Sequence, residues 1–89
     1  MVSIRRMVLD VLKPHQPNAL DFSRAIAEAG RDYHVRLTVL EVDESTETLQ
    51  IVLEAKSIDF EAVQSAINNM GGSLHSIDEV EVQNNAGIN

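Results

Sequence analysis

The chain has 89 residues and carries 14 acidic against seven basic side chains, which gives a formal net charge of −7. That length leaves room for one domain with one small core. The negative charge repels phosphate backbones, and one tyrosine and two phenylalanines offer few stacking surfaces, so we expect no nucleic-acid partner. The absence of cysteine excludes disulfides, zinc-thiolate centres and thiol nucleophiles.

Membrane and catalytic signals are also missing from the sequence. No apolar run comes near the ~20 residues that a membrane span needs, and the first residues do not read as a signal peptide. We therefore expect a cytoplasmic protein without a membrane partner. The serines lack a nucleophile-elbow context and no glycine-rich loop follows a strand pattern, so we expect no catalytic residues and no enzymatic activity.

The segment Ile4–Leu12 is apolar on both alternating faces, which is typical of a central strand. Lys13 and the two prolines that follow should end it. After this loop, Asn18 is placed to cap a helix whose apolar residues recur at helical spacing as far as Gly30. The chain therefore opens with a buried strand, a proline-bracketed loop and an amphipathic helix.

The middle of the chain reads as a hairpin followed by a second helix. Residues 35–43 and 49–54 alternate apolar and polar side chains and are joined by a short polar segment. Asp59 can cap a helix that carries Phe60, Val63 and Ile67 on one stripe. The pair Gly71 and Gly72 should end it.

The last strand, over residues 74–82, is less regular. Its four apolar residues do not share one parity; they are Leu74, Ile77, Val80 and Val82. One extra residue near Asp78 and Glu79 would restore the alternation, so we predict a β-bulge there.

The order strand, helix, strand, strand, helix, strand predicts an α+β fold. The compact solution with two right-handed crossovers is the ferredoxin-like βαββαβ sandwich. It has one four-stranded antiparallel sheet in the order 4-1-3-2 with both helices on one face. We expect a single domain over residues 1–83 and a frayed tail over residues 84–89, where there is little to bury.

This topology places several possible metal ligands at one end of the molecule. His15, the hairpin acids Asp43, Glu44 and Glu47, and His75 all lie where strands begin or end at the same sheet edge. Mixed nitrogen and oxygen groups of this kind can hold a divalent metal ion. The alternative is that the acids form a solvated turn and the histidines bond to loop carbonyls, and the spacing matches no EF-hand or HxxxH motif.

Asp10 raises a separate question because a carboxylate in a central strand is costly to bury unpaired. One interpretation is an ion pair across the open sheet face, where Arg6 and Glu54 are the expected neighbours. The other is an oxygen ligand for calcium or magnesium at a subunit boundary. Asp78, beside the predicted bulge, could join such a site.

The sheet face away from the helices is expected to bury against another subunit. Its apolar side chains would exceed the few hundred Å² that monomers usually leave exposed. The predicted interface residues are Ile4, Arg6, Val8, Leu12, Leu40, Val42 and Val52. We therefore expect the protein to form a homo-oligomer.

Two stretches, RRMVLDVLKPHQP near the start and GGSLHSIDEV near the end, resemble the signatures of an archaeal family catalogued as domain of unknown function 211. The similarity runs from about Val2 to Val82. The resemblance implies a ferredoxin-like fold, homo-oligomers and a bound divalent cation such as calcium, with no established activity. The matching positions are Arg5, Arg6, Asp10, Lys13, Pro14, His15, Gly71, Gly72, His75, Ser76, Asp78 and Glu79. The stretch AGRDYH and the asparagine-rich tail depart from it.

The sequence thus predicts a non-enzymatic homo-oligomer that binds calcium or magnesium through carboxylates. The alternative is a regulatory module of the amino-acid-sensing type, with an unidentified small molecule held at a subunit interface near residues 13–18. The prolines in that loop weaken this alternative, since such sites favour glycine. Copper-chaperone chemistry would need a cysteine pair and is excluded.

Overall fold

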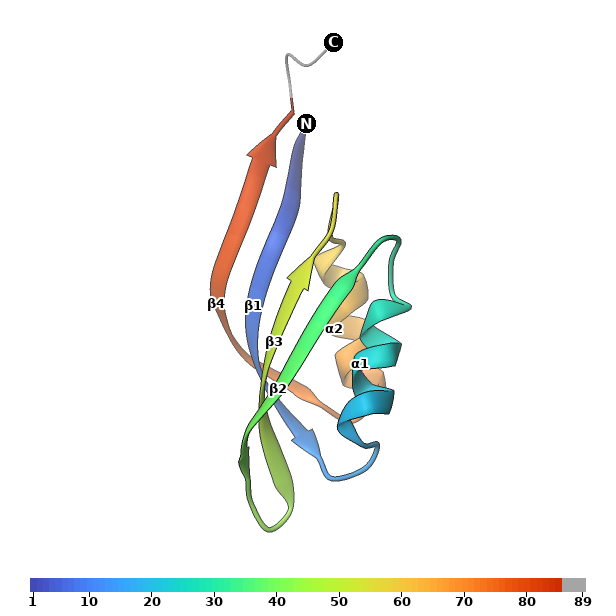
Figure 1. Ribbon diagram of the computed structural model, residues 1–89, viewed down its shortest axis with the longest axis vertical. Coiled ribbons are helices and arrows are strands. Elements are labelled where there is room, and N and C mark those ends of the chain that lie inside the picture. Colours follow the sequence, from blue (N-terminus) through green and yellow to red (C-terminus); the bar gives the residue numbers. More distant parts are fainter. Residues whose placement is uncertain (86–89) are drawn as a thin grey trace.

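The computed structural model describes residues 1–85 and has the predicted element order. The elements are β1 (Val2–Pro14), α1 (Ala19–Ala27), β2 (His34–Val42), β3 (Thr46–Glu54), α2 (Phe60–Asn69) and β4 (Ser73–Asn84). The strands form one antiparallel sheet in the order β2-β3-β1-β4, and both helices cover the same face (Figure 1). This is the ferredoxin-like α+β fold predicted from the sequence, with β1 in the interior of the sheet.

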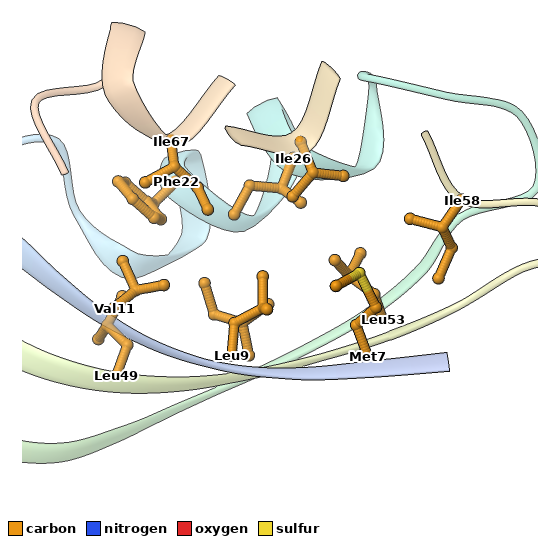
Figure 2. Close-up of a cluster of buried hydrophobic side chains, with 11 residues drawn as sticks. Met7, Leu9, Val11, Phe22, Ile26, Leu49, Leu53, Ile58 and Ile67 are labelled. Atoms are coloured by element: carbon orange, nitrogen blue, oxygen red, sulfur yellow. The ribbon is translucent and has the colours of Figure 1, made fainter. Parts of the chain in front are cut away.

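The core lies between the sheet and the two helices (Figure 2). Met7, Leu9 and Val11 of β1 point into it, and alternate residues of β3 do the same because paired strands share a face. Phe22 of α1 and Ile67 of α2 close it from above and are fully buried. The apolar stripes at helical spacing are therefore the surfaces that hold the helices on the sheet.

Both helices begin where the sequence predicts. Oδ1 of Asn18 accepts a hydrogen bond from the backbone N–H of Asp21 at 2.8 Å. Oδ1 of Asp59 accepts from the N–H of Ala62 at 3.2 Å. Each cap satisfies one of the N–H groups that the first turn of a helix leaves unpaired, which fixes where the helix starts.

Two glycines let α2 turn directly into β4. Gly71 has φ of +84°, a conformation that side chains with a Cβ rarely adopt. A Cβ on Gly72 would lie 2.8 Å from Cζ of Phe22, so only glycine allows the chain to pass this close to the core. The start of β4 is consequently fixed against α1 and α2.

The bulge predicted in β4 is present, and a second lies nearby. Val8 pairs with Glu79 and Leu9 with Ile77, so Asp78 is an extra residue without a partner on β1. His75 is a second extra residue, because Asp10 pairs with Ser76 and Val11 with Leu74. These two irregularities restore a common face for the apolar residues of β4. That face is the helix side, since their partners across the ladder are core residues of β1.

Because of bulges, two of the predicted interface residues, Ile4 and Val42, lie on the opposite face of the sheet from the one predicted. Arg5 is the extra residue in β1, so Ile4 packs against the core on the helix side and not on the open face. Leu40 is the extra residue in β2. Beyond it Val42 pairs with Glu47, which lies on the same helix side of β3 as Leu49, so Val42 also lies on the helix side. An added residue inverts the alternation that follows it, which is why both positions change face.

Strand boundaries differ from the prediction at both ends of the β1–β4 pair. β1 continues through Pro14 because β4 pairs with it only as far as Leu12, and a proline is tolerated where an edge is free. The tail expected to fray from residue 84 is held at its start, since the N–H of Asn85 donates to the carbonyl of Met1 at 2.7 Å. Residues 86–89 of that tail lie outside the described residues.

β4 is the edge strand beside β1, and beyond the end of β3 at Glu54 the first residues of β1 and the last of β4 continue as a two-stranded ribbon (Figure 1). From Ile77 onward the helix-side apolar residues of β4 remain in contact with solvent. Ile77, Val80 and Val82 are 46%, 53% and 56% exposed. These three residues form an apolar stripe along the helix side of an edge strand, which we call the β4 stripe.

The core predicts a large difference between two identical substitutions. Leu9→Ala should destabilise the protein by about 2–5 kcal/mol, because it removes buried methyl groups and leaves a cavity. Leu20→Ala, on the exposed side of α1, should change stability by no more than about 0.5 kcal/mol. Denaturant unfolding followed by circular dichroism measures both. Equal losses would mean that the core is not centred on β1.

Candidate functional site

Lys13 is fully buried at the end of β1. Its Nζ donates to the carbonyl oxygens of Pro14 and Pro17, each at 2.8 Å, and lies 3.0 Å from Oε1 of Glu47. The carbonyl oxygen of His15 is more distant, at 3.3 Å. An ammonium group has three N–H donors, so the three nearest oxygens satisfy it and offset the cost of removing its charge from water.

His15 joins the same cluster from the loop. Its Nδ1 lies 3.0 Å from Oε2 of Glu47, and its Nε2 lies 2.9 Å from the carbonyl oxygen of Glu44. Both oxygens only accept hydrogen bonds, so the ring can donate to both only when it is protonated. The Glu47 carboxylate and then the Glu44 carbonyl therefore raise the pKa of His15, while His15 and then Lys13 lower the pKa of Glu47.

Lys13, His15 and Glu47, which we call the Lys13 clamp, tie the proline loop to the β2–β3 hairpin. All three ammonium donors and both ring nitrogens have partners within the protein. The arrangement therefore fits a structural tie, with no donor left over for a ligand.

A second group of residues lies on the open face, the sheet face opposite the helices. They line a depression with a volume of about 280 Å³, which we call the Asp10 depression: Asp10, Leu12, Thr48 and His75. The carboxylate of Asp10 makes no hydrogen bond or ion pair with any of residues 1–85. The depression thus contains an unpaired acid beside an imidazole, a hydroxyl and an apolar side chain.

The ion pair expected for Asp10 with Arg6 is wrong. Arg6 instead bridges Glu54, at 2.7 Å, and Glu79, at 2.6 Å, on the strands that flank β1. The register explains this, because Glu54 is directly opposite Arg6 and Glu79 is one row away, opposite Val8. Closer carboxylates on both neighbouring strands therefore occupy the guanidinium.

The open face is less apolar than expected. Of the predicted interface residues, only Val8, Leu12, Leu40 and Val52 supply apolar atoms to it, and Val8 is already buried within the protomer at 7% exposure. The Arg6 bridge occupies the rows next to Val8. The three exposed apolar residues of the β4 stripe lie on the other face.

The residues predicted as metal ligands lie in separate places. They are Asp10, His15, Asp43, Glu44, His75 and Asp78. His15 belongs to the Lys13 clamp, Asp10 and His75 share the depression, and Asp78 accepts from Oγ of Ser76 at 2.7 Å. The two hairpin acids are exposed. Within residues 1–85, no three histidine or acidic side chains form a group that could hold a metal ion, so cation binding stays a prediction.

Sequence reasoning missed the role of Lys13, although a signal was available. Met7, Leu9 and Val11 define the inward phase of β1, and Lys13 continues it. A lysine in the core phase, immediately before two prolines and a histidine, predicts a buried ammonium that needs oxygen partners. No comparable signal joined Asp10 to His75, because their proximity depends on the bulges of β4.

These features define a small ferredoxin-like α+β protein with a buried Lys13 clamp, an Arg6 bridge on its open face and a shallow depression beside it. The chain belongs to the DUF211 family, described as "Uncharacterized ArCR", which it matches over residues 5–86. It is similar to the uncharacterized protein MJ0319 of Methanocaldococcus jannaschii, with 41% identity over 80 residues that span 90% of this chain and 82% of that protein. The resemblance noted in the sequence is thereby confirmed.

Within residues 1–85, no helix combines the length and the apolar character that crossing a membrane would take.

Removing the Lys13 ammonium should be costly. Lys13→Met keeps most of the side-chain volume but leaves Glu47 and the loop carbonyls without their shared donor, so we expect a loss of about 3–5 kcal/mol. Lys56→Met, at an exposed position, is the matched control and should change stability by about 0.5 kcal/mol or less. Urea unfolding midpoints compare the two variants. A Lys13→Met protein as stable as the control would show that the clamp contributes nothing.

The raised pKa of His15 predicts a pH dependence of a definite sign. Its stabilising contribution is complete below the unfolded value of about 6.5 and is lost as pH rises through the higher folded value. Thermal unfolding between pH 5 and 8 should therefore show a decline on the alkaline side that His15→Ala abolishes. His34→Ala, which removes an exposed ring without a hydrogen-bond partner within residues 1–85, should keep the wild-type decline. An unchanged decline in His15→Ala would assign it to another group.

Proposed function

We propose that the protein is a non-enzymatic homo-oligomer in which β4 of one protomer pairs with β2 of the next. The observation that carries this proposal is that the two free edges of the sheet complement each other. β4 is an edge strand with an acidic open face and the apolar β4 stripe on its helix side. β2, the opposite edge, presents Arg36 on its open face, with Glu41 near the end of the strand, and exposes Val39 and Val42 on its helix side.

Charge supports pairing between unlike edges over pairing of β4 with itself. Glu79 and Glu81 of β4 pair with Val8 and Arg6 on the open face, and Arg36 of β2 lies on that same face opposite Val52. Arg36 and Glu81 make no ion pair within residues 1–85. Two β4 edges together would oppose like charges, whereas β4 against β2 brings unlike charges together.

Strand direction supports the same arrangement. β4 is antiparallel to β1, whereas β2 runs parallel to β1 because each is antiparallel to β3. A second protomer in the same orientation would therefore continue the sheet with an antiparallel β4–β2 pair. Such a contact joins different surfaces of the two copies, so it produces a ring when the rotation closes and a filament when it does not.

Burial provides the driving force in this proposal. The β4 stripe lies on the helix side of the sheet, and pairing that brings Arg36 beside Glu81 would place it next to Val35 and Leu37, which lie on the same side of β2. Removing apolar area from water contributes about 25 cal/mol per Å². The unpaired N–H and C=O groups of both edges would gain partners in the same step.

Charge reversal tests the contact. Arg36→Glu and Glu81→Arg should each weaken self-association at least tenfold, because each opposes like charges across the edge. The double variant should recover most of the loss. Analytical ultracentrifugation over a concentration series measures the association constant. Lys56→Glu, which reverses the charge of an exposed residue between β3 and α2, on neither edge strand, is the matched control and should assemble as the wild type does.

A wild-type protein that stays monomeric at tens of micromolar would contradict the proposal, as would a double variant no better than the singles. The predicted calcium or magnesium enters as an additional outcome, because ligands from two protomers would be needed to complete a site. Native mass spectrometry before and after chelation reports it. We expect the oligomer to persist without metal, and its dissociation on chelation would assign the contact to a bridging cation instead.

A further inference from the structure

Asp10 is an acid for which the surrounding sheet supplies no counter-charge. It lies on β1 between Gln50 of β3 and Ser76 of β4, and its carboxylate bonds to neither. The hydroxyl of Ser76 donates to Asp78 instead, at 2.7 Å. Arg6, two rows away on the same face, is occupied by its own two carboxylates. The Asp10 carboxylate is therefore half-buried, ionisable and unoccupied by any partner within residues 1–85.

The other residues of the Asp10 depression add acceptors and an apolar surface. The imidazole of His75 and the hydroxyl of Thr48 can each accept a hydrogen bond, and neither side chain is engaged elsewhere within residues 1–85. Leu12 is 42% exposed and supplies the apolar part of the lining. Three acceptors beside an apolar surface form a small amphipathic site with one negative charge.

From this set we infer that the Asp10 depression binds a primary ammonium group attached to a short alkyl chain. Such a group has three N–H donors, which match the carboxylate, the imidazole nitrogen and the hydroxyl in number. The carboxylate supplies the charge-assisted hydrogen bond, and the alkyl chain rests on Leu12. The net charge of −7 raises the local concentration of such cations.

Size and donor count distinguish this ligand from others. A volume of about 280 Å³ lies at the lower end of small-molecule sites, which favours a small amine. Calcium takes about six to eight oxygen ligands, and the depression offers a single carboxylate. A primary ammonium is thus a better match than a bare divalent ion.

The site lies away from the two residues whose charges carry the proposed assembly. Three of its four lining residues come from the interior strands β1 and β3, and the fourth, His75, lies at the opposite end of β4 from Glu81. Arg36 lies on β2, at the other edge of the sheet. Binding can therefore be measured whether or not the protein assembles, and failure of one proposal leaves the other standing.

Ligand-observed NMR titration of the full chain with butylamine hydrochloride, at neutral pH and fixed ionic strength, tests the inference. We expect saturable binding that Asp10→Asn weakens at least tenfold. Asp78→Asn is the matched control. It neutralises a nearby acid of β4 that already accepts a hydrogen bond from Ser76, so this variant should bind butylamine as the wild type does. Circular dichroism of each variant verifies that it is folded.

Two further probes separate the contribution of the N–H donors from the contributions of the positive charge and of the alkyl chain. Butanol should not bind, and butyltrimethylammonium, which has the charge but no N–H donors, should bind at least tenfold more weakly than butylamine. Lysine with both backbone termini blocked and a free side-chain amine tests whether the natural ligand is a protein lysine or a free small amine. Tighter binding than butylamine would indicate a lysine side chain of a protein, and weaker binding a free small amine; both outcomes support the ammonium assignment.

Three results would overturn the inference. One is equal butylamine affinity in Asp10→Asn and wild type. Another is equal affinity for butylamine and butyltrimethylammonium, which would reduce the effect to general attraction by an acidic protein. The third is displacement of the amine by calcium chloride at fixed ionic strength, with calcium binding lost in Asp10→Asn, which would make the depression a metal site.

Discussion

The buried ammonium of Lys13 holds the end of β1 to the turn of the β2–β3 hairpin. It bonds to oxygens of the loop after β1 and of Glu47 in β3, so the two segments cannot move apart without leaving a charge unpaired. That tie fixes where α1 begins, because Asn18 caps the helix immediately after the loop. The position of α1 in turn determines how Phe22 meets Gly72 and where β4 starts.

Alternation and helical spacing were enough to predict the fold. The four strands, two helices and their caps follow from local pattern, and the sheet order follows from handedness and compactness. The bulge in β4 could also be predicted, because its apolar residues fall out of phase. The bulges at Arg5 and Leu40 could not, because Ile4 and Val42 are apolar on either face and give no sign that the phase has changed.

The sites were harder to predict than the fold because they depend on register. His15 and the hairpin were correctly expected to meet, since both follow strand ends at one edge. Asp10 and His75 were assigned to different places, and only the two extra residues of β4 bring them to one depression. A shift of one residue in pairing changes which side chains are neighbours, and the apolar pattern of β4 does not say which residue is the extra one.

The pairing of the first strand with the last has a consequence for how the chain folds. β1 receives its second neighbour only when β4 has been made, so during synthesis the strand that becomes central is itself an edge with apolar residues on both sides. Contacts between distant parts of the sequence form slowly, because a long loop must close first. The nascent protein is therefore most exposed to misassociation in the interval between the completion of β3 and the arrival of β4.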